Sequence, residues 1–409
     1  MTHPYCTSLF VRQDTSMKYR RFGKTELSMP VISCGGMRYQ HKWDDIPWQD
    51  VPRTGQENIE RILSYALEKG INHIETARGY GSSEMQLGHA LKQFPRESYI
   101  LQTKVSPEDS PEDFLKTFET SLNNLQQDHV DLFGFHGLNN REAMERAMRP
   151  GGCLEAAQKL KEDGRIKHIG FSTHAANHEI LELIDSGEFE YVNLHWYFTN
   201  QLNTAAVEAA ARHDMGVFII SPNDKGGQLY SPPEKLRELC QPLDPMVFNG
   251  LFCLSNPHVH TLSCGAARPE DFDIHIAGLE YYDRAIEMTQ PIISRIHDEV
   301  AKVAGPEWME KWHRGIPEWR ELPNRINVKD ILRLWTWAKA VDLIDFGKWR
   351  YNMLSETDSW VPGNPVTEFD DQAMIQACRN NPFAEKIPGR LREAHKIFSG
   401  NKVERLSAG

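Results

Sequence analysis

The run Val130–His136, VDLFGFH, is a short apolar segment that ends in a histidine. A run of this kind predicts a β-strand. Seven further strand-like runs lie along the chain, with helical patterns between them. They are residues Val31–Cys34, Asn72–Thr76, Tyr99–Lys104, His168–Ser172, Tyr191–His195, Val217–Ser221 and His260–Cys264.

The segments between the strands have the apolar period of helices. In the first of them, Ile59, Ile62, Leu63 and Ala66 are spaced to form one stripe, and the pattern stops at Gly70. Further helical patterns cover Pro111–Leu125, Leu154–Asp163, His178–Asp185 and Thr204–His213. Alternating strands and helices predict an α/β fold with a parallel sheet. Eight repeats over roughly 250 residues favour a closed (β/α)8 TIM barrel.

The two ends of the chain differ from this middle part. Lys18–Val31 predicts a hairpin with Gly23-Lys24 at its turn, and residues 1–17 are expected to be a flexible leader. After residue 276 the alternation ends, and seven of the ten tryptophans follow. Val328–Phe346 predicts a helix and Leu391–Phe398 a second, weaker one. We therefore expect the barrel at residues 18–275 and a helical, Trp-rich C-terminal extension at residues 276–409, packed on the barrel.

Composition limits the classes of function. The formal charge of −11 argues against broad binding to nucleic acid or acidic membranes. No stretch approaches the ~18 apolar residues of a membrane span. A G-x-G-x-x-G fingerprint is missing, which weakens an open dinucleotide-binding sheet. The seven cysteines are odd in number and form no C-x-x-C pair, which fits reduced thiols in a cytoplasmic protein and disfavours a zinc ribbon or an iron–sulfur cluster.

Ionisable residues gather at the predicted strand ends. Glu75, Lys104 and His136 stand at or near the ends of three successive strands, and Tyr80 follows closely after the first. In a barrel of this kind the carboxyl ends of the strands carry the active site. The four side chains are therefore expected to converge there.

Six stretches in this order resemble the aldo-keto reductase family over about residues 18–275. They are Ile74–Ala77 with Tyr80-Gly81 and Glu84, Leu101–Lys104, Asp131–His136, Gly164–Ser172, Ser221-Pro222 and Gly265–Glu270. The resemblance implies NAD(P)H-dependent reduction of an aldehyde or ketone, with a small-molecule carbonyl compound as the substrate.

The resemblance also implies a role for each of the four residues. Tyr80 would protonate the developing alkoxide, Lys104 would sit beside the phenol, Glu75 would pair with Lys104, and His136 would orient the carbonyl. The chemistry is reasonable in itself: hydride arriving at a carbonyl carbon leaves charge on oxygen, which needs a donor. A nearby ammonium is expected to lower the tyrosine pKa from its usual ~10. Glu75 stands where the family has aspartate, so its carboxylate is displaced by one methylene.

A nicotinamide cofactor site follows from the same resemblance. Gly36 and Met37 would line the nicotinamide, and Ser172, Thr173 and Asn193 would bond its carboxamide. Ser221, Asn223, Lys225, Gly226 and Gln228 would form the pyrophosphate loop, and Gly265 and Arg268 would bind the far end. A helix start with Arg268 could hold a 2′-phosphate, which favours NADP(H) while NAD(H) stays possible. Thr173 replaces a usual asparagine, and Ile220 replaces a usual aromatic residue.

The C-terminal part has a resemblance of its own. Asn327–Leu332 and Pro388–His395 are similar to the extension of an aldo-keto reductase subgroup that carries cysteine-ligated iron–sulfur clusters. Only Cys378 lies in the matching segment, so we expect the scaffold without a cluster and no metal site.

Two other functions stay open. Glu75, Thr173 and Ile220 are compatible with a non-catalytic NADP(H)-binding sensor or regulatory subunit. A different barrel enzyme, such as a metal-dependent lyase, is the third reading, but no cluster of His and Asp at strand ends supports it. The sequence leaves the oligomeric state open.

Overall fold

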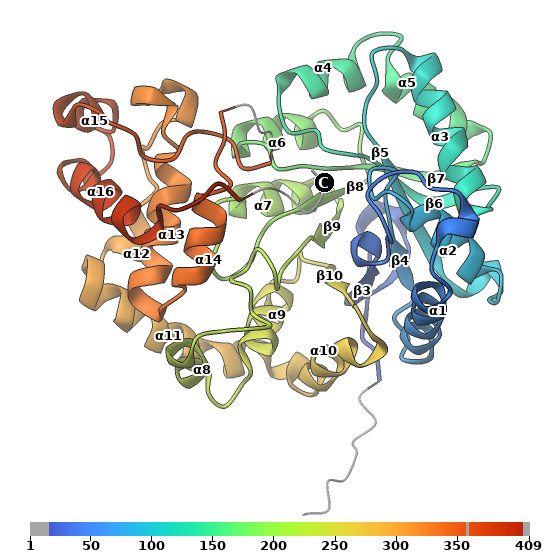
Figure 1. Ribbon diagram of the computed structural model, residues 1–409, viewed down its shortest axis with the longest axis horizontal. Coiled ribbons are helices and arrows are strands. Elements are labelled where there is room, and N and C mark those ends of the chain that lie inside the picture. The colour runs from blue at the N-terminus through green and yellow to red at the C-terminus, as the bar shows by residue number, and fades with distance from the viewer. Residues whose placement is uncertain (1–15, 357–359, 404–409) are drawn as a thin grey trace, which may run out of the picture.

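The computed structural model describes residues 16–356 and 360–403. Eight parallel strands close into a barrel, in the order β10-β3-β4-β5-β6-β7-β8-β9 (Figure 1). The strands are β3 Ile32–Gly35, β4 His73–Glu75, β5 Ile100–Val105, β6 Val130–Phe135, β7 Ile166–Ser172, β8 Tyr191–Leu194, β9 Gly216–Ile219 and β10 Thr261–Gly265. The predicted (β/α)8 barrel is confirmed. The predicted leader lies outside the described residues except for its last two positions.

Helices surround the barrel. They are α1 Arg53–Glu68, α2 Ser83–Leu91, α3 Pro111–Leu125, α4 Arg141–Met148, α5 Cys153–Glu162, α6 Asn177–Asp185, α7 Thr204–Arg212, α8 Glu234–Cys240, α9 Pro245–Ser255 and α10 Asp273–Gly278. The predicted stripe of α1 is buried at Ile59, Ile62, Leu63 and Ala66. At α3 the side chain of Ser110 accepts the backbone N–H of Asp113 at 3.0 Å, which satisfies one free donor of the first turn.

The N-terminal hairpin closes one end of the barrel. Its strands β1 Tyr19–Arg21 and β2 Ser28–Pro30 pair antiparallel, and Gly23 at the turn has φ +55°. Phe22 is fully buried and packs on Tyr191, which begins β8. A Cβ on Gly216, at the start of β9, would lie 2.6 Å from the Phe22 ring, so glycine is needed there. With the amino ends of the strands plugged, the opposite rim is left for a ligand.

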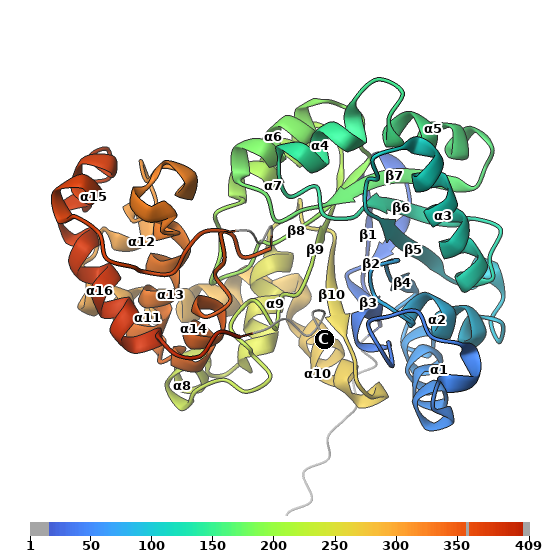
Figure 2. The same cartoon turned by 45° about the horizontal axis from the view of Figure 1, so that its top comes forward.

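The C-terminal extension is helical and lies beside the barrel (Figure 1, Figure 2). Its helices are α11 Ala285–Ala304, α12 Trp308–Lys311, α13 Val328–Val341, α14 Ile344–Tyr351, α15 Asp371–Ala377 and α16 Ile387–Phe398. The single helix predicted over Val328–Phe346 is wrong, because Asp342 adopts a left-handed φ of +61° and separates α13 from α14. The domain boundary at residue 275 stays a prediction, and it falls inside α10.

Tryptophans form the interior of the extension. Trp308 is fully buried, and the guanidinium of Arg390 lies 3.8 Å from its ring centroid and 4.9 Å from that of Trp335. Such cation–π contacts stabilise most where water is excluded. The indole N–H of Trp337 donates to the carbonyl of Thr199 at 2.8 Å, which joins α13 to a loop of the barrel. The indoles of Trp308, Trp335 and Trp337 are therefore buried rather than exposed to solvent.

The described part of the chain has no helix that is long and apolar enough to cross a membrane. Within the same residues no group of three or more His, Cys, Asp or Glu side chains is placed to hold a metal ion. The six described cysteines are buried and unpaired: Cys34, Cys153, Cys240, Cys253, Cys264 and Cys378.

Candidate active site

A cavity of about 560 Å³ opens at the rim where the strands finish. Its wall includes Glu75, Tyr80, Lys104 and His136. Glu75 ends β4, Lys104 lies one residue before the end of β5, and His136 directly follows β6. Because neighbouring parallel strands finish at the same rim, the structure brings the four predicted side chains together.

Lys104 and Glu75 form an ion pair inside the barrel, with side chains 1% and 5% exposed. The Nζ of Lys104 contacts Oε1 of Glu75 and donates to the carbonyl of Thr76 at 2.6 Å. Gly134 faces Lys104 across the strand pair, and a Cβ there would lie 3.2 Å from Cγ of the lysine. The glycine therefore leaves room for the lysine side chain. Burial lowers the pKa of Lys104, and the carboxylate of Glu75 opposes that shift.

The Glu75 carboxylate also contacts the phenol. Tyr80 donates from its hydroxyl to the same Oε1 atom at 3.4 Å, while the Nζ of Lys104 lies 5.0 Å from the Tyr80 ring centroid. In the described residues no hydrogen bond joins Lys104 to Tyr80. Burial, followed by the charge of Glu75, raises the pKa of Tyr80 well above its usual value. The expected lowering of this pKa is wrong, because the glutamate carboxylate, not the ammonium, is the hydrogen-bond partner of the phenol.

His136 completes the group. Its ring centroid lies 5.6 Å from that of Tyr80, with the two planes at 87°. Burial and the positive charge of Lys104 lower the pKa of His136 to about 3. The imidazole is therefore neutral near pH 7, and one of its ring nitrogens carries a proton that can be donated to a ligand.

The extension contributes a residue that the sequence did not place in the site. Trp360 lies in the wall of the cavity, with its ring 6.0 Å from that of His136 and 4.4 Å from that of His174. The Nζ of Lys225 lies 5.4 Å from the Trp360 ring centroid. Trp360 follows α14 in the chain, far from every strand end, so no strand pattern signals its position.

Seven of the predicted cofactor residues line the same cavity: Met37, Ser172, Ser221, Asn223, Lys225, Gly265 and Arg268. The other five, Gly36, Thr173, Asn193, Gly226 and Gln228, do not. The hydroxyl of Thr173 donates to the backbone carbonyl of Leu138 at 2.6 Å, so its proton is not available to a ligand. Gly226 is needed by the loop itself, because a Cβ there would lie 1.9 Å from the carbonyl oxygen of Pro222. This close approach explains why the position is a glycine without the predicted phosphate contact.

Asn193 has an unusual environment. It is fully buried, and neither its amide nitrogen nor its amide oxygen has a partner among the described residues. It pairs in register with Ser172, which lines the cavity. Buried polar groups are nearly always hydrogen-bonded, so an orphaned amide beside a cavity is compatible with a polar ligand there. The residues present thus fit a group that carries an amide, as nicotinamide does.

Arg268 stands at the far end of the cavity. Its side chain is 73% exposed, and Nε donates to Oδ1 of Asp271 at 3.0 Å. Glu270 and Asp271 line the cavity as well. The helix that follows begins as a short 3₁₀ turn over Pro269–Phe272, with Arg268 as its N-cap residue, and continues as α10. Arg268 therefore shares this end of the cavity with two carboxylates.

Comparison with known proteins agrees with this geometry: residues 31–226 match the model of the aldo/keto reductase family. A probable aldo-keto reductase 1 of Glycine max is 29% identical over 188 residues, which are 43% of this chain and 52% of the relative. An NADH-specific methylglyoxal reductase of Escherichia coli is 27% identical over 199 residues, 43% of this chain and 56% of the relative. The chain spans about half the length of the curated relatives it matches.

The aldo/keto reductase fold is also found among solved structures. The holo form of an aldo-keto reductase from Bacillus halodurans superposes with a TM-score of 0.58 at 22% identity, covering 68% of this chain and 96% of that one. At this identity the likeness concerns the fold.

Proposed function

We propose that this chain is an oxidoreductase that reduces a small aldehyde or ketone with a nicotinamide cofactor. One observation carries the proposal: a phenol, a buried ammonium–carboxylate pair and a neutral imidazole meet in one cavity at the strand ends. A bound nicotinamide would supply the hydride. Tyr80 would supply the proton, which its raised pKa keeps in place near pH 7.

The other groups assist Tyr80. His136 is neutral and donates a second hydrogen bond to the same carbonyl oxygen, which stabilises the charge that develops there. Lys104 neutralises Glu75 and lies over the Tyr80 ring, so its charge stabilises the phenolate left after proton transfer. The Glu75 carboxylate opposes formation of that phenolate and holds the phenol by its hydrogen bond.

The cofactor would be held by groups on one side of the cavity. Ser172 and the orphaned amide of Asn193 are suited to a carboxamide, and Ser221, Asn223 and Lys225 are suited to phosphate oxygens. Ile220 would make an apolar contact in place of an aromatic stack.

The pH profile tests the protonation states. Because the Tyr80 pKa is raised and the His136 pKa is about 3, both groups keep their active form at intermediate pH. We expect kcat/KM for reduction, at saturating cofactor, to be flat from about pH 5 to 9, since neither group titrates there. A marked fall between pH 7 and 9 would mean that the phenol loses its proton early, against the environment described.

The preference between NADP(H) and NAD(H) can be tested with a variant of Arg268. We propose NADP(H), with NAD(H) as the alternative, because the two Nη groups of Arg268 remain for a 2′-phosphate when Nε is held by Asp271. In Arg268→Ala we expect KM for NADPH to rise ~10-fold, the loss of about one charge-assisted hydrogen bond, and KM for NADH to stay within about threefold. Arg212→Ala, an exposed arginine on α7, is the control. Equal changes for both cofactors would mean that Arg268 does not contact a 2′-phosphate, against the proposed preference for NADP(H).

Oxidation of NADPH and NADH with a panel of aromatic aldehydes tests the whole proposal. The second candidate is a sensor that binds the cofactor without turnover. The Glu75 carboxylate supports it, because this group, and not the Lys104 ammonium, is the hydrogen-bond partner of the Tyr80 phenol. Tight cofactor binding, followed by cofactor fluorescence, with no aldehyde-dependent oxidation would support the sensor and overturn the reductase.

A further inference from the structure

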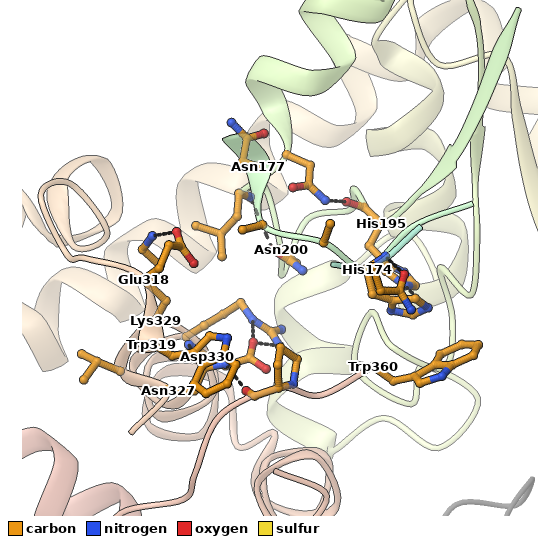
Figure 3. A pocket seen from close by; sticks show the side chains of 18 of the residues that line it. His174, Asn177, His195, Asn200, Glu318, Trp319, Asn327, Lys329, Asp330 and Trp360 are labelled. Atoms are coloured by element: carbon orange, nitrogen blue, oxygen red, sulfur yellow. Dashed lines mark hydrogen bonds and ion pairs between the residues drawn. The ribbon is translucent and has the colours of Figure 1, made fainter. Parts of the chain in front are cut away.

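A second cavity of about 390 Å³ lies between the barrel rim and the extension. It adjoins the first, because His174, Lys225 and Trp360 line both. Figure 3 shows His174 and Trp360 on one side of it and Lys329 and Asp330 on the other. Its size is within the range of small-molecule sites.

Arg350, from α14, lines this second cavity and forms no ion pair within the described ranges. Its residue is 8% exposed, and it makes no hydrogen bond or ion pair with any residue in the described ranges. Its Nε is buried without a partner, and its guanidinium carbon lies 5.5 Å from the Trp349 ring centroid. A buried charge without a partner is costly.

Arg333, from α13, is the second buried cation of the cavity. It is 3% exposed and donates from Nε and Nη2 to Oδ1 of Asp330, at 3.0 and 2.7 Å. Its Nη1 is buried with no partner among the described residues. Two guanidinium groups therefore share Asp330 as their near carboxylate. Asp224 also acts on Arg350, and it accepts a hydrogen bond from Tyr230 at 3.2 Å, which leaves its negative charge in place.

Two of the other three described carboxylates of the wall are paired with basic side chains, and the third accepts a backbone hydrogen bond. Glu318 pairs with Lys329 at 2.6 Å, and Glu356 pairs with Arg325. Glu179 accepts the backbone N–H of Ala176 at 3.3 Å. None of these three forms an ion pair with Arg350, and among the described carboxylates Asp330 and Asp224 are those whose charges act on its guanidinium.

We propose that this cavity binds the carboxylate of the substrate, so that the enzyme acts on oxo acids whose carbonyl group reaches Tyr80 in the first cavity. The carboxylate would accept from Arg350 and from Nη1 of Arg333, and Trp360 would cover the apolar middle of the molecule. The two guanidinium nitrogens without a partner among the described residues, Nε of Arg350 and Nη1 of Arg333, suit a carboxylate, which accepts through its two oxygens. This inference rests on the proposed carbonyl reduction.

The experiment uses ω-oxo acids of increasing chain length, each compared with its methyl ester, on the full-length protein. Wild type should show a kcat/KM for the best acid at least ~10-fold above that of its ester. In Arg350→Met this preference should disappear while the ester is reduced as before. Arg392→Met is the matched control, because Arg392 lies in the same extension, is exposed and pairs with Asp371. It should behave as wild type.

Binding is measured separately from turnover. Calorimetric titration with the matching ω-hydroxy acids should show a Kd that rises ~10–100-fold in Arg350→Met and recovers partly in Arg350→Lys. Binding that depends on Arg350 without turnover of any aldehyde would sustain the anion site and overturn the reductase. Reduction of acids and esters at equal rates, with unchanged binding in Arg350→Met, would overturn the anion site alone. Circular dichroism checks that each variant is folded.

Discussion

Tyr80→Phe should lower kcat for carbonyl reduction by ~10²–10⁴ while leaving the Kd of the cofactor within about twofold. The variant keeps the ring that packs at 5.6 Å against His136 and removes only the hydroxyl that donates to Glu75. The reaction then lacks its proton donor, so the loss falls on the chemical step. Single-turnover mixing of enzyme, cofactor and aldehyde measures that step directly.

Tyr65→Phe is the matched control for this experiment. The Tyr65 hydroxyl also donates to a carboxylate, that of Asp273, but Tyr65 does not line the first cavity. Its removal should leave kcat unchanged. Wild-type rates in Tyr80→Phe would mean that another group supplies the proton, and the proposed mechanism would be lost.

Lys104→Met should destabilise the protein by ~3–5 kcal/mol as well as abolish activity. The reason is that Glu75 would be left as a buried carboxylate without its ion-pair partner, which is costlier than losing the pair as a whole. Unfolding in urea, followed by circular dichroism, gives the free energy of unfolding.

The double variant Lys104→Met with Glu75→Gln separates the two effects. It removes the unpaired charge, so it should recover much of the stability and none of the activity. Lys116→Met, which breaks an exposed pair with Asp113, should leave the free energy of unfolding nearly unchanged. A Lys104→Met protein as stable as wild type would indicate that Glu75 is protonated and that the pair is not ionic.

The barrel could be predicted because it follows from local patterns. Apolar runs such as Val130–His136 alternate with amphipathic helices, and the ends of parallel strands must share a rim. That rule alone placed Glu75, Lys104 and His136 together. The direction of the Tyr80 pKa could not be predicted, because it depends on which of two opposite charges lies nearer the phenol.

Other features depend on contacts between distant segments. The sequence predicts that Thr173 donates a hydrogen bond to a ligand, but in the structure its hydroxyl donates to the backbone carbonyl of Leu138. The break between α13 and α14 arises at Asp342, a single residue with positive φ inside an otherwise helical pattern. Trp360 and Arg350 reach the rim only because the extension folds back against the barrel, and no local spacing encodes that approach.

The position of Trp360 means that the wall of the first cavity is shared between the barrel and a residue that follows helices α11 to α14 in the chain. A gene fragment encoding the barrel alone would yield an open groove with His136 facing bulk water, together with a bare apolar face around Phe198 where Trp337 now packs. The two parts therefore depend on each other for the burial of these side chains, and a change in the extension can alter the cavity without altering the rim of the barrel.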